Sequence, residues 1–377
     1  MKQQINGNNP IRVLHMAPIR MGGITELVLT LSEKIDSEKV QFDYLTFEDT
    51  FDQASKRAKE AHSTIYRVDL QTINDPIVRG LKKFFGIIKL VHSEQIKIIH
   101  INSSTPYEVL VAFAAKIGGA KKIIYHSHNS SYYPGQKLVK LSEVFKWFMP
   151  FVITDYLSCS DAAARFMFPK KIVDAENYIV IKNGVDYDKH SFKPEVRTEL
   201  RKKYGLENNF VLGHVGRFNV QKNHEFLIDI FYEVYKHDNS ARLFLVGIGE
   251  TENQIKEKVK RLGIEEVVIF HGLSDEVNRL WNMLDVFVMP SLYEGLPVAG
   301  VEAQANGLPL IVSNTITQEL KITDAVEYIG LDEKTSKWCE VIERYNGYKR
   351  KNTRKEITSA GFNIDDTVIR LEGIYLS

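Results

Sequence analysis

The sequence predicts an α/β protein with two Rossmann-like, doubly wound domains. Its 377 residues are too many for one ordinary core and suit two domains of typical size. Short apolar runs rich in β-forming residues alternate with helix-like segments along the whole chain, which is typical of βαβ units and parallel sheets. The alternation restarts after Asn183-Gly184, in a polar stretch punctuated by Gly and Pro. We therefore expect an N-terminal domain over residues 1–186 and a C-terminal domain over 187–377.

The first half contains apolar runs of strand length, separated by segments with helical periodicity. The expected strands are Arg12–Ala17, Val40–Phe47, Thr64–Val68, Ile96–Ile101, Lys122–Tyr125 and Ile153–Cys159. The expected helices are Thr25–Ile35, Ile77–His92, Tyr107–Ile117 and Asp161–Phe168.

The second half repeats this order. The expected strands are Phe210–Val215, Arg242–Val246, Val267–Phe270, Val286–Met289 and Leu310–Val312. The expected helices are His224–Lys236, Glu252–Leu262, Glu276–Met283 and Val298–Asn306. The last segment, Ile364–Leu376, is expected to form a helix that packs back on the first domain.

The composition argues against several classes of protein. Apolar residues make up 44% and charged residues 26%, as in a soluble globular protein. The formal net charge is +1, and there is no dense basic stripe of the kind that binds duplex nucleic acid. The two cysteines, Cys159 and Cys339, lie in different halves, which argues against a disulfide framework or a cysteine-based zinc site and suits a reducing cytoplasm. We see no export signal and no apolar run of about 18 residues, so we expect a cytoplasmic protein, soluble or peripheral to the inner face of a membrane.

The densest functional pattern is a Gly/Pro turn that follows the expected strand Val286–Met289 and leads into a helix. Ligands of α/β sheets bind at such strand ends, and the free N–H groups and dipole of a new helix favour an anion. The turn therefore predicts a cradle for a diphosphate. Its expected residues are Gly295, Leu296, Pro297 and Val298.

Two glutamates frame this turn. Glu302 lies inside the expected helix, where its carboxylate can accept hydrogen bonds from ribose hydroxyls, and Glu294 lies on the turn, nearer to a reacting sugar. The simpler interpretation makes Glu294 a cap at the helix entry and Glu302 an exposed helix residue.

A second turn follows the expected strand Phe210–Val215 and contains Gly216 and Arg217, with Lys222 shortly after them. Arginine binds phosphate oxygens with two parallel hydrogen bonds and lysine adds a point charge, so the pair suits a leaving diphosphate. Ordinary solvated loop residues are the simpler interpretation.

Two further loops are rich in glycine. Gly22 and Gly23 follow the first strand and would let the backbone approach a phosphate before the next helix begins. Gly247-Ile248-Gly249 begins like a dinucleotide-binding fingerprint, but Glu252 stands where its last glycine belongs. A nicotinamide-dependent enzyme therefore loses its best support.

His126 and His128 lie at the end of the strand Lys122–Tyr125, at the ligand-binding edge of a parallel sheet. The pair lacks a third ligand nearby, so a hydrogen-bonding or proton-handling role is expected rather than a metal site, with a structural role as the alternative for each. Asp186-Tyr187-Asp188 resembles the D-x-D string of metal-using sugar transferases, but it falls in the expected linker. We expect no metal there.

The segment Leu138–Phe151 mixes Lys140 and Lys146 with large apolar residues such as Trp147. A basic amphipathic helix of this kind can rest on a membrane beside a lipid-linked acceptor. Packing against the core is the alternative.

Together these motifs resemble family 4 of the glycosyltransferases, and more closely its capsular and exopolysaccharide biosynthesis members. The resemblance covers most of the chain in the family's order. It is carried by Arg12–His15 with Gly22-Gly23, by Lys39–Asp43, by Ser158-Cys159-Ser160, by Asn183–Asp186 and by Glu294–Glu302. The resemblance implies the GT-B fold, in which two Rossmann-like domains face each other across a cleft. It also implies retention of anomeric configuration, no metal or other cofactor, and a nucleotide bound mainly by the C-terminal domain.

The resemblance further implies roles for individual residues. Arg217 and Lys222 match the diphosphate-binding pair, Glu302 matches the ribose contact, and Glu294 matches the glutamate beside the transferred sugar. Gly22 and Gly23 match the loop that closes over the phosphates. His128 matches the N-domain histidine near the donor sugar, with His126 as the alternative. The expected catalytic residues are thus Glu294 and His128, and the expected donor site comprises Gly22, Gly23, Gly216, Arg217, Lys222, Leu273, Gly295, Leu296, Pro297, Val298 and Glu302.

We therefore expect a retaining, metal-independent transferase that moves a sugar from a nucleotide diphosphate to a lipid-linked glycan or another acceptor in surface polysaccharide biosynthesis. The resemblance favours UDP over GDP. An enzyme like a UDP-sugar 2-epimerase is the alternative, because it also has two Rossmann-like halves, but it does not need this set of Arg, Lys and Glu residues. A two-lobed sugar-binding protein would carry an export signal.

Overall fold

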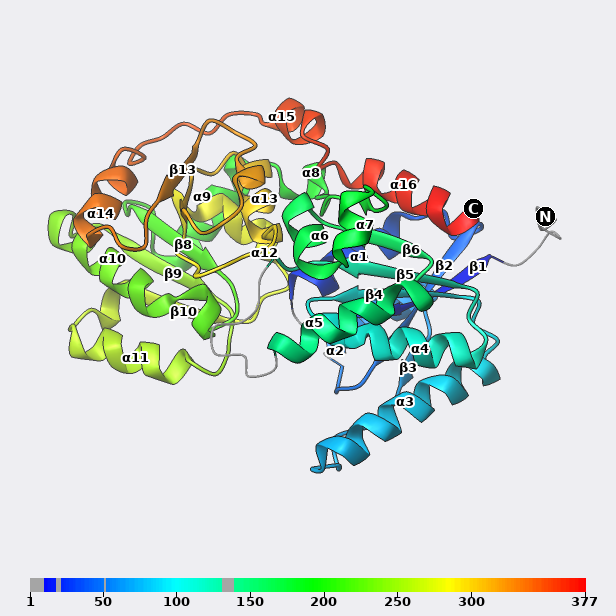
Figure 1. Ribbon diagram of the computed structural model, residues 1–377. Coiled ribbons are helices and arrows are strands. Elements are labelled where there is room, and N and C mark those ends of the chain that lie inside the picture. The colour runs from blue at the N-terminus through cyan, green and yellow to red at the C-terminus, as the bar shows by residue number, and fades with distance from the viewer. Residues whose placement is uncertain (1–9, 18–21, 51, 131–138) are drawn as a thin grey trace. The chain divides into compact units, whose positions relative to one another are not determined.

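The computed structural model describes residues 10–17, 22–50, 52–130 and 139–377 (Figure 1). The chain divides into two compact units. Unit 1 is the chain up to Lys182 together with Asp365–Ser377, and unit 2 is Asn183–Ile364. Residues of the C-terminal helix therefore belong to the unit that the N-terminal half builds, and the chain enters unit 2 shortly before Asp186.

Unit 1 contains a parallel sheet with the strand order β3-β2-β1-β4-β5-β6-β7. Its strands are β1 (Ile11–Met16), β2 (Val40–Thr46), β3 (Ile65–Arg67), β4 (Ile98–Ser103), β5 (Lys122–Ser127), β6 (Asp155–Ser158) and β7 (Ile179–Val180). Its helices are α1 (Gly23–Lys34), α2 (Asp52–Glu60), α3 (Pro76–Ser93), η1 (Pro106–Glu108), α4 (Val109–Gly118), α5 (Val139–Phe148), η2 (Met149–Phe151), α6 (Asp161–Met167), α7 (Lys170–Asp174) and α16 (Ile364–Leu376).

The two faces of this sheet differ in chemistry because side chains alternate along a strand. On β4, Ile99 and Ile101 join an apolar core that also contains Ile87 of α3 and Ala115 of α4. The alternate positions of the same strand, His100 and Asn102, are polar and buried. The sheet thus buries an apolar face against α3 and α4 and a polar set of side chains on its other face.

Local sequence sets where the helices of unit 1 begin and end. Asp75 caps α3 by accepting hydrogen bonds from the backbone N–H groups of Ile77 and Val78, and Pro76 has a fixed φ that suits the first turn. Gly119 ends α4 in the left-handed conformation, at φ 106°, which glycine adopts without a steric penalty.

Unit 2 contains a second parallel sheet with the order β10-β9-β8-β11-β12-β13. Its strands are β8 (Val211–Val215), β9 (Arg242–Val246), β10 (Val268–Gly272), β11 (Val286–Met289), β12 (Leu310–Ser313) and β13 (Val326–Ile329). Its helices are α8 (Tyr187–His190), α9 (Pro194–Tyr204), η3 (Val220–Lys222), α10 (His224–His237), α11 (Glu252–Arg261), η4 (Glu265–Val267), α12 (Val277–Leu280), η5 (Trp281–Met283), α13 (Val298–Ala305), η6 (Gln318–Leu320), α14 (Thr335–Glu343) and α15 (Arg354–Ser359).

In both sheets the chain reverses its direction of winding at one point. β1 lies between β2 and β4, and β8 lies between β9 and β11. Open α/β sheets bind ligands outside the carboxyl ends of the strands at such a switch point. We therefore expect ligand-binding residues among those that follow β1, β4, β8 and β11.

The expected α/β class with two parallel Rossmann-like sheets is confirmed. Most expected strands and helices are present with ends shifted by a few residues, and the expected helix Glu276–Met283 is α12 followed by η5. The edge strands β7 and β13 and the helices α2, α7, α8, α9, α14 and α15 were not anticipated. Only Leu200 and Arg201 of α9 are buried, so the helix needs few apolar residues on one face. Its sequence therefore shows little helical periodicity, which is why it was not predicted.

Candidate active site

The turn after β8 brings Lys222 close to the backbone of Gly216. A Cβ atom on Gly216 would lie 2.9 Å from Nε2 of His214 and 3.2 Å from Cε of Lys222. Only glycine leaves room there for the aliphatic part of the lysine side chain. The turn after β9 approaches equally closely, since a Cβ on Gly247 would lie 2.1 Å from the carbonyl oxygen of Gly216. Gly247 also has φ +136°, a conformation that L side chains rarely adopt.

Lys222 and Glu294 form a largely buried ion pair. The lysine Nζ lies 2.6 Å from Oε1 of Glu294, and the two side chains are 16% and 8% exposed. Nε2 of Gln221 donates to Oε2 of Glu294 at 3.3 Å and to the carbonyl oxygen of Tyr293 at 3.0 Å. The backbone N–H of Leu292 donates to the carbonyl of Gln221 at 2.8 Å. These contacts join η3 to the loop after β11, so two expected site residues from different strands are brought together.

The same loop leads into α13 through Gly295, Leu296 and Pro297. Pro297 occupies the N-cap position and supplies no side-chain hydrogen bond to the first turn. The first backbone N–H groups of a helix have no partner inside the helix, and the helix dipole places partial positive charge there. Nδ2 of Asn183 donates to the carbonyl of Leu296 at 3.2 Å and holds the loop in place. The start of α13, at Val298, therefore presents the chemistry of an anion site.

Glu302 is buried within α13 and faces a histidine that sequence reasoning missed. Its side chain is 10% exposed, and Oε1 lies 3.5 Å from Nε2 of His190 on α8. Nδ1 of His190 donates to the carbonyl of Asp186 at 3.0 Å. Burial lowers the pKa of His190, but the charge and hydrogen bond of Glu302 together with the Asp186 carbonyl outweigh burial, and the pKa is raised from its ordinary value. No local motif marks His190, because its role depends on a helix more than a hundred residues along the chain.

Arg217 follows Gly216 and pairs with a different carboxylate from Lys222. Its side chain is 57% exposed and forms an ion pair with Glu250, at 3.2 Å, in the loop after β9. Leu273 is half-buried and comes directly after β10. Both residues lie at the carboxyl edge of the unit 2 sheet, and neither is a member of the Lys222–Glu294 ion pair.

In unit 1, Gly22 and Gly23 stand at the start of α1. Gly22 is in the N-cap position with φ 164°, which is an extended conformation open to any residue, and nothing would lie within 4 Å of a Cβ placed on it. The backbone and its surroundings therefore do not themselves require a glycine at position 22. Met21, which precedes the pair, lies outside the described residues.

His126 and His128 are both buried, with ring centroids 4.2 Å apart. Nδ1 of His126 lies 3.1 Å from Nε2 of His100, and Nε2 of His128 lies 3.1 Å from Oδ1 of Asn102. Burial, and then the neighbouring His128 and His100, hold the pKa of His126 well below its ordinary value. The two candidate histidines therefore belong to one network of hydrogen bonds within unit 1.

The D-x-D string has protein partners for both aspartates. Asp186 caps α8 by accepting a hydrogen bond from the backbone N–H of Lys189 at 3.2 Å, and Asp188 forms an ion pair with Arg354. The string is therefore used to start a short helix and to hold α15.

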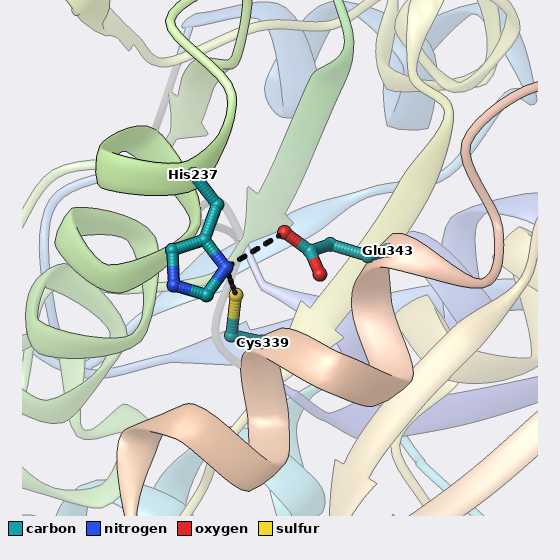
Figure 2. Close-up of side chains that lie close together, drawn as sticks. All are labelled: His237, Cys339 and Glu343. Atoms are coloured by element: carbon teal, nitrogen blue, oxygen red, sulfur yellow. Dashed lines mark hydrogen bonds and ion pairs between the residues drawn. The ribbon is translucent and has the colours of Figure 1, made fainter.

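Within the described residues, one other group has the spacing of metal ligands, and Figure 2 shows it. Nδ1 of His237 lies 3.2 Å from Oε1 of Glu343 and 3.6 Å from Sγ of Cys339. Burial and the charge of Glu343 raise the pKa of the Cys339 thiol to about 12, so the thiol keeps its proton at neutral pH. The group lies at the C-terminal end of α10, at the sheet edge opposite to the carboxyl ends of the strands. We interpret it as a hydrogen-bonded contact between α10 and α14.

The fold defines a class of α/β protein with two Rossmann-like units, and comparison with known proteins identifies the family. Residues 21–189 match the family described as Glycosyltransferase Family 4, and residues 196–337 match the family described as Glycosyl transferases group 1. The putative glycosyltransferase EpsF of Bacillus subtilis (strain 168) is 30% identical over 97% of this chain and 96% of that protein. The chain therefore belongs to the family 4 glycosyltransferases.

Other relatives agree with this membership. A UDP-Gal:alpha-D-GlcNAc-diphosphoundecaprenol alpha-1,3-galactosyltransferase of Escherichia coli is 28% identical over 80% of this chain and 81% of that protein. The capsular polysaccharide biosynthesis glycosyltransferase CapM of Staphylococcus aureus is 26% identical over 67% of each chain. The protein is thus a retaining, nucleotide-sugar-dependent glycosyltransferase of polysaccharide biosynthesis, and the epimerase alternative is set aside.

Solved structures confirm the GT-B fold. Anabaena Alr3699/HepE, in a complex with UDP and glucose, aligns with a TM-score of 0.73 at 18% identity and covers 96% of this chain and 95% of that one. Sucrose-phosphate synthase from Thermosynechococcus elongatus aligns with a TM-score of 0.75 at 15% identity, over 97% of this chain and 98% of that one. In the part of the chain that the structure describes, no helix combines the length and apolar character needed to cross a bilayer.

Proposed function

We propose that the protein moves a sugar from a UDP-sugar onto a glycan or lipid-linked acceptor without the help of a metal ion. The observation that carries the proposal is the buried Lys222–Glu294 pair, at 2.6 Å, in the loop that leads into α13. It places a cation, a carboxylate and an uncapped helix start at the carboxyl edge of β8 and β11. This combination suits a sugar joined to a diphosphate.

We assign the charges of this edge to the leaving group. As the glycosidic bond breaks, negative charge grows on the diphosphate and an oxocarbenium-like sugar remains. Lys222, Arg217 and the N–H groups around Val298 stabilise that charge where other transferases use a metal ion. The exposed Arg217 exchanges its contact with Glu250 for a phosphate, which costs little because exposed ion pairs contribute little.

We assign the carboxylates to the sugars of the donor. Glu294 accepts hydrogen bonds from hydroxyls of the transferred sugar, and Glu302, held by His190, accepts them from the ribose. Same-face attack, in which the departing phosphate oxygen takes the proton of the acceptor, retains the configuration without a covalent enzyme intermediate. Glu294 then has no need to act as a nucleophile.

We divide the substrates between the two units. Unit 2, with Gly216, Leu273 and the turn Gly295–Val298, binds the nucleotide sugar. Unit 1 binds the acceptor, and Gly22, Gly23 and His128 are its candidate site residues. UDP is preferred to GDP because a UDP-sugar is named as the donor of the E. coli relative and UDP is bound in the Anabaena structure.

The test is nucleotide release from a panel of UDP- and GDP-sugars with EDTA present, for the wild type and for Glu294→Ala and Lys222→Ala. Slow hydrolysis of one UDP-sugar by the wild type, abolished by both substitutions, is the expected result. If no donor is hydrolysed, equilibrium binding of UDP and GDP is measured. Failure to bind either nucleotide contradicts the proposal.

We also propose that unit 1 contacts an anionic membrane surface. α4 packs against both α3 and α5, and all three helices expose apolar side chains. These are Ile77, Val78, Leu81 and Phe85 on α3, Leu110 and Ile117 on α4, and Leu141, Val144 and Trp147 on α5. α3 contains no acidic residue, and three of its basic residues, Arg79, Lys82 and Lys89, are exposed. A basic, apolar helix surface favours anionic lipid.

The sequence indicated the membrane contact for Leu138–Phe151, and residue 138 lies outside the described residues. It predicted the helix of α3 but no membrane contact for it. Flotation with phosphatidylglycerol vesicles tests the surface. Leu81→Glu/Trp147→Glu is expected to lose vesicle binding, whereas Ile369→Glu, at a site 67% exposed on α16, keeps it. Equal flotation of the two variants contradicts the membrane contact.

A further inference from the structure

A buried polar network crosses one face of the unit 1 sheet and ends at the C-terminal helix. His15 on β1 and His100 on β4 are each 1% exposed, and Tyr375 on α16 is 2% exposed. Strand pairing sets His15 opposite His100 and sets Asn102 opposite His126 on β5. The network is therefore built by three adjacent strands and by a helix from the far end of the chain.

Two hydrogen bonds lead from the tyrosine hydroxyl to His126. Oη of Tyr375 lies 2.7 Å from Nδ1 of His100. Nε2 of His100 lies 3.1 Å from Nδ1 of His126.

A second branch leads from the same hydroxyl to His128. Oη of Tyr375 lies 3.4 Å from Nε2 of His15, and Nδ1 of His15 lies 3.3 Å from Nδ2 of Asn102. Nδ2 of Asn102 also lies 3.4 Å from the carbonyl oxygen of Met16, and Oδ1 lies 3.1 Å from Nε2 of His128. Both candidate histidines are thus connected to Tyr375.

His15, His100, His126 and Tyr375 are neutral. Burial first, and His126 second, lower the pKa of His15 to about 3, and burial holds the pKa of His100 well below its ordinary value. Burial also raises the pKa of Tyr375 well above its ordinary value, so its hydroxyl keeps its proton. A neutral imidazole has one N–H donor and one acceptor nitrogen. Each neutral imidazole therefore donates through one ring nitrogen and accepts through the other. The direction of one hydrogen bond then fixes the direction of the next.

The direction is set at Met16, because a backbone carbonyl only accepts hydrogen bonds. The amide NH₂ of Asn102 must point to that carbonyl and to His15, so Nδ1 of His15 accepts and Nε2 carries the proton. That proton goes to Oη of Tyr375, whose own proton goes to Nδ1 of His100.

The same order continues to the candidate histidines. His100 then carries its proton on Nε2 and donates it to Nδ1 of His126, which leaves the proton of His126 on Nε2. On the other branch, Oδ1 of Asn102 accepts from Nε2 of His128. Nε2 of His126 is buried and makes no hydrogen bond of normal geometry with any described residue. The nearby Ile181 carbonyl favours a proton on this ring, because it raises the pKa against burial and the neighbouring histidines.

We propose that Tyr375 is a positioning residue for the candidate histidine His126: its hydroxyl accepts from His15 and donates to His100, which fixes the tautomers of His100 and His126. The catalytic consequence rests on the proposed function. A ring held in one tautomer presents the same donor or acceptor to a sugar in every catalytic cycle, as outer hydrogen bonds do for ligating histidines.

The first test reads the tautomers directly and needs no substrate. Long-range ¹H–¹⁵N spectra of protein labelled with ¹⁵N-histidine distinguish the two neutral tautomers, and His100→Gln and His126→Gln assign the signals. In the wild type we expect the Nε2–H form for both residues. Tyr375→Phe keeps the ring and removes only the hydroxyl, and we expect mixed tautomers at His100 and His126.

The matched control is Tyr44→Phe. Tyr44 is also fully buried beside His15, with ring centroids 6.4 Å apart, but its hydroxyl forms no hydrogen bond with a described histidine. Its variant should leave the signals of His100 and His126 unchanged. If Tyr375→Phe does not fold, His100→Gln cuts the same branch and should mix the tautomers of His126. If Tyr375→Phe folds and the signals of His100 and His126 are unchanged, the proposal is overturned. Where only His100→Gln folds, unchanged signals of His126 overturn it.

The second test asks whether the ordering matters for transfer. With the donor identified by the release assay, Tyr375→Phe is expected to lower kcat about tenfold at an unchanged KM for the donor, the lower end of what such outer hydrogen bonds contribute. Tyr44→Phe should keep the wild-type kcat. A changed tautomer with wild-type kcat overturns the catalytic part of the proposal. If the wild type transfers no sugar at all, the proposed function fails, and the NMR result still decides whether Tyr375 orders the network.

Discussion

Nζ of Lys222 lies 2.6 Å from Oε1 of Glu294, although the two residues are 72 positions apart in the sequence. The pair is largely buried and its two members follow different strands, β8 and β11. In the proposed mechanism, the buried cation exchanges its carboxylate partner for a phosphate when a donor binds. Two predictions follow from this arrangement.

Glu294→Gln should separate catalysis from nucleotide binding. The substitution keeps the shape of the side chain but removes the charge that neutralises Lys222, so UDP should bind as tightly as to the wild type or more tightly. Transfer should fall by about 100-fold, the lower end of what one charge-stabilising group contributes. Calorimetry gives the affinity for UDP and a coupled assay gives kcat.

The control for this experiment is Glu250→Gln, which removes the exposed partner of Arg217. It should change kcat little, because exposed ion pairs contribute about 0–1 kcal/mol. Weaker UDP binding by Glu294→Gln would mean that the glutamate holds the loop together rather than facing the sugar.

Gly216→Ala should disturb the same pair through the backbone. The added methyl group would lie 2.9 Å from Nε2 of His214 and 3.2 Å from Cε of Lys222, so the His214 ring must shift and the lysine side chain must give way slightly. We expect kcat/KM to fall about tenfold or more, because small displacements of catalytic groups are costly. Gly80→Ala, where nothing lies within 4 Å, is the control and should behave as the wild type. Equal activity of the two variants would show that the lysine can move freely.

His190 should make stability depend on pH through Glu302. Burial lowers its pKa, but Glu302 and the Asp186 carbonyl outweigh burial, so the pKa in the folded protein is raised. A histidine of this kind contributes stability fully below its unfolded pKa of about 6.5 and loses that contribution as the pH rises through the folded value. The wild type should therefore exceed His190→Gln by about 2 kcal/mol near pH 6, and by less at alkaline pH.

Urea unfolding at several pH values measures this difference. His92→Gln, at an exposed position near the end of α3, is the control and should follow the wild type throughout. A difference between wild type and His190→Gln that grows with pH would contradict the assignment of a charged His190.

Removal of metal should leave transfer unchanged. The aspartates of the D-x-D string are used to cap α8 and to pair with Arg354, and the Cys339 thiol beside His237 keeps its proton at neutral pH. We therefore expect equal turnover before and after dialysis against EDTA, and equal turnover of Asp188→Asn and Cys339→Ser. Activity that is lost with EDTA and returns with Mg²⁺ or Mn²⁺ would falsify the metal-independent mechanism.

Local sequence patterns predicted much of the fold. Alternation of apolar runs with helical segments predicted two parallel Rossmann-like sheets, and the family and the GT-B fold are confirmed. The patterns failed where apolar periodicity is weak, as in α9 and at the edge strand β13. The residues proposed for the donor site remain predictions, although Lys222 and Glu294, chosen from separate motifs, lie in direct contact.

The sequence by itself determined most of the strands and the turns that follow them, because strand alternation, helix caps and glycine turns are properties of neighbouring residues. Only the tertiary structure decided which side chains are partners. His190 pairs with Glu302, and Tyr375 reaches His100 across 275 positions of the chain. The order of strands in the sheet and the burial of each side chain select these partners, and both depend on contacts between segments that are far apart in the sequence.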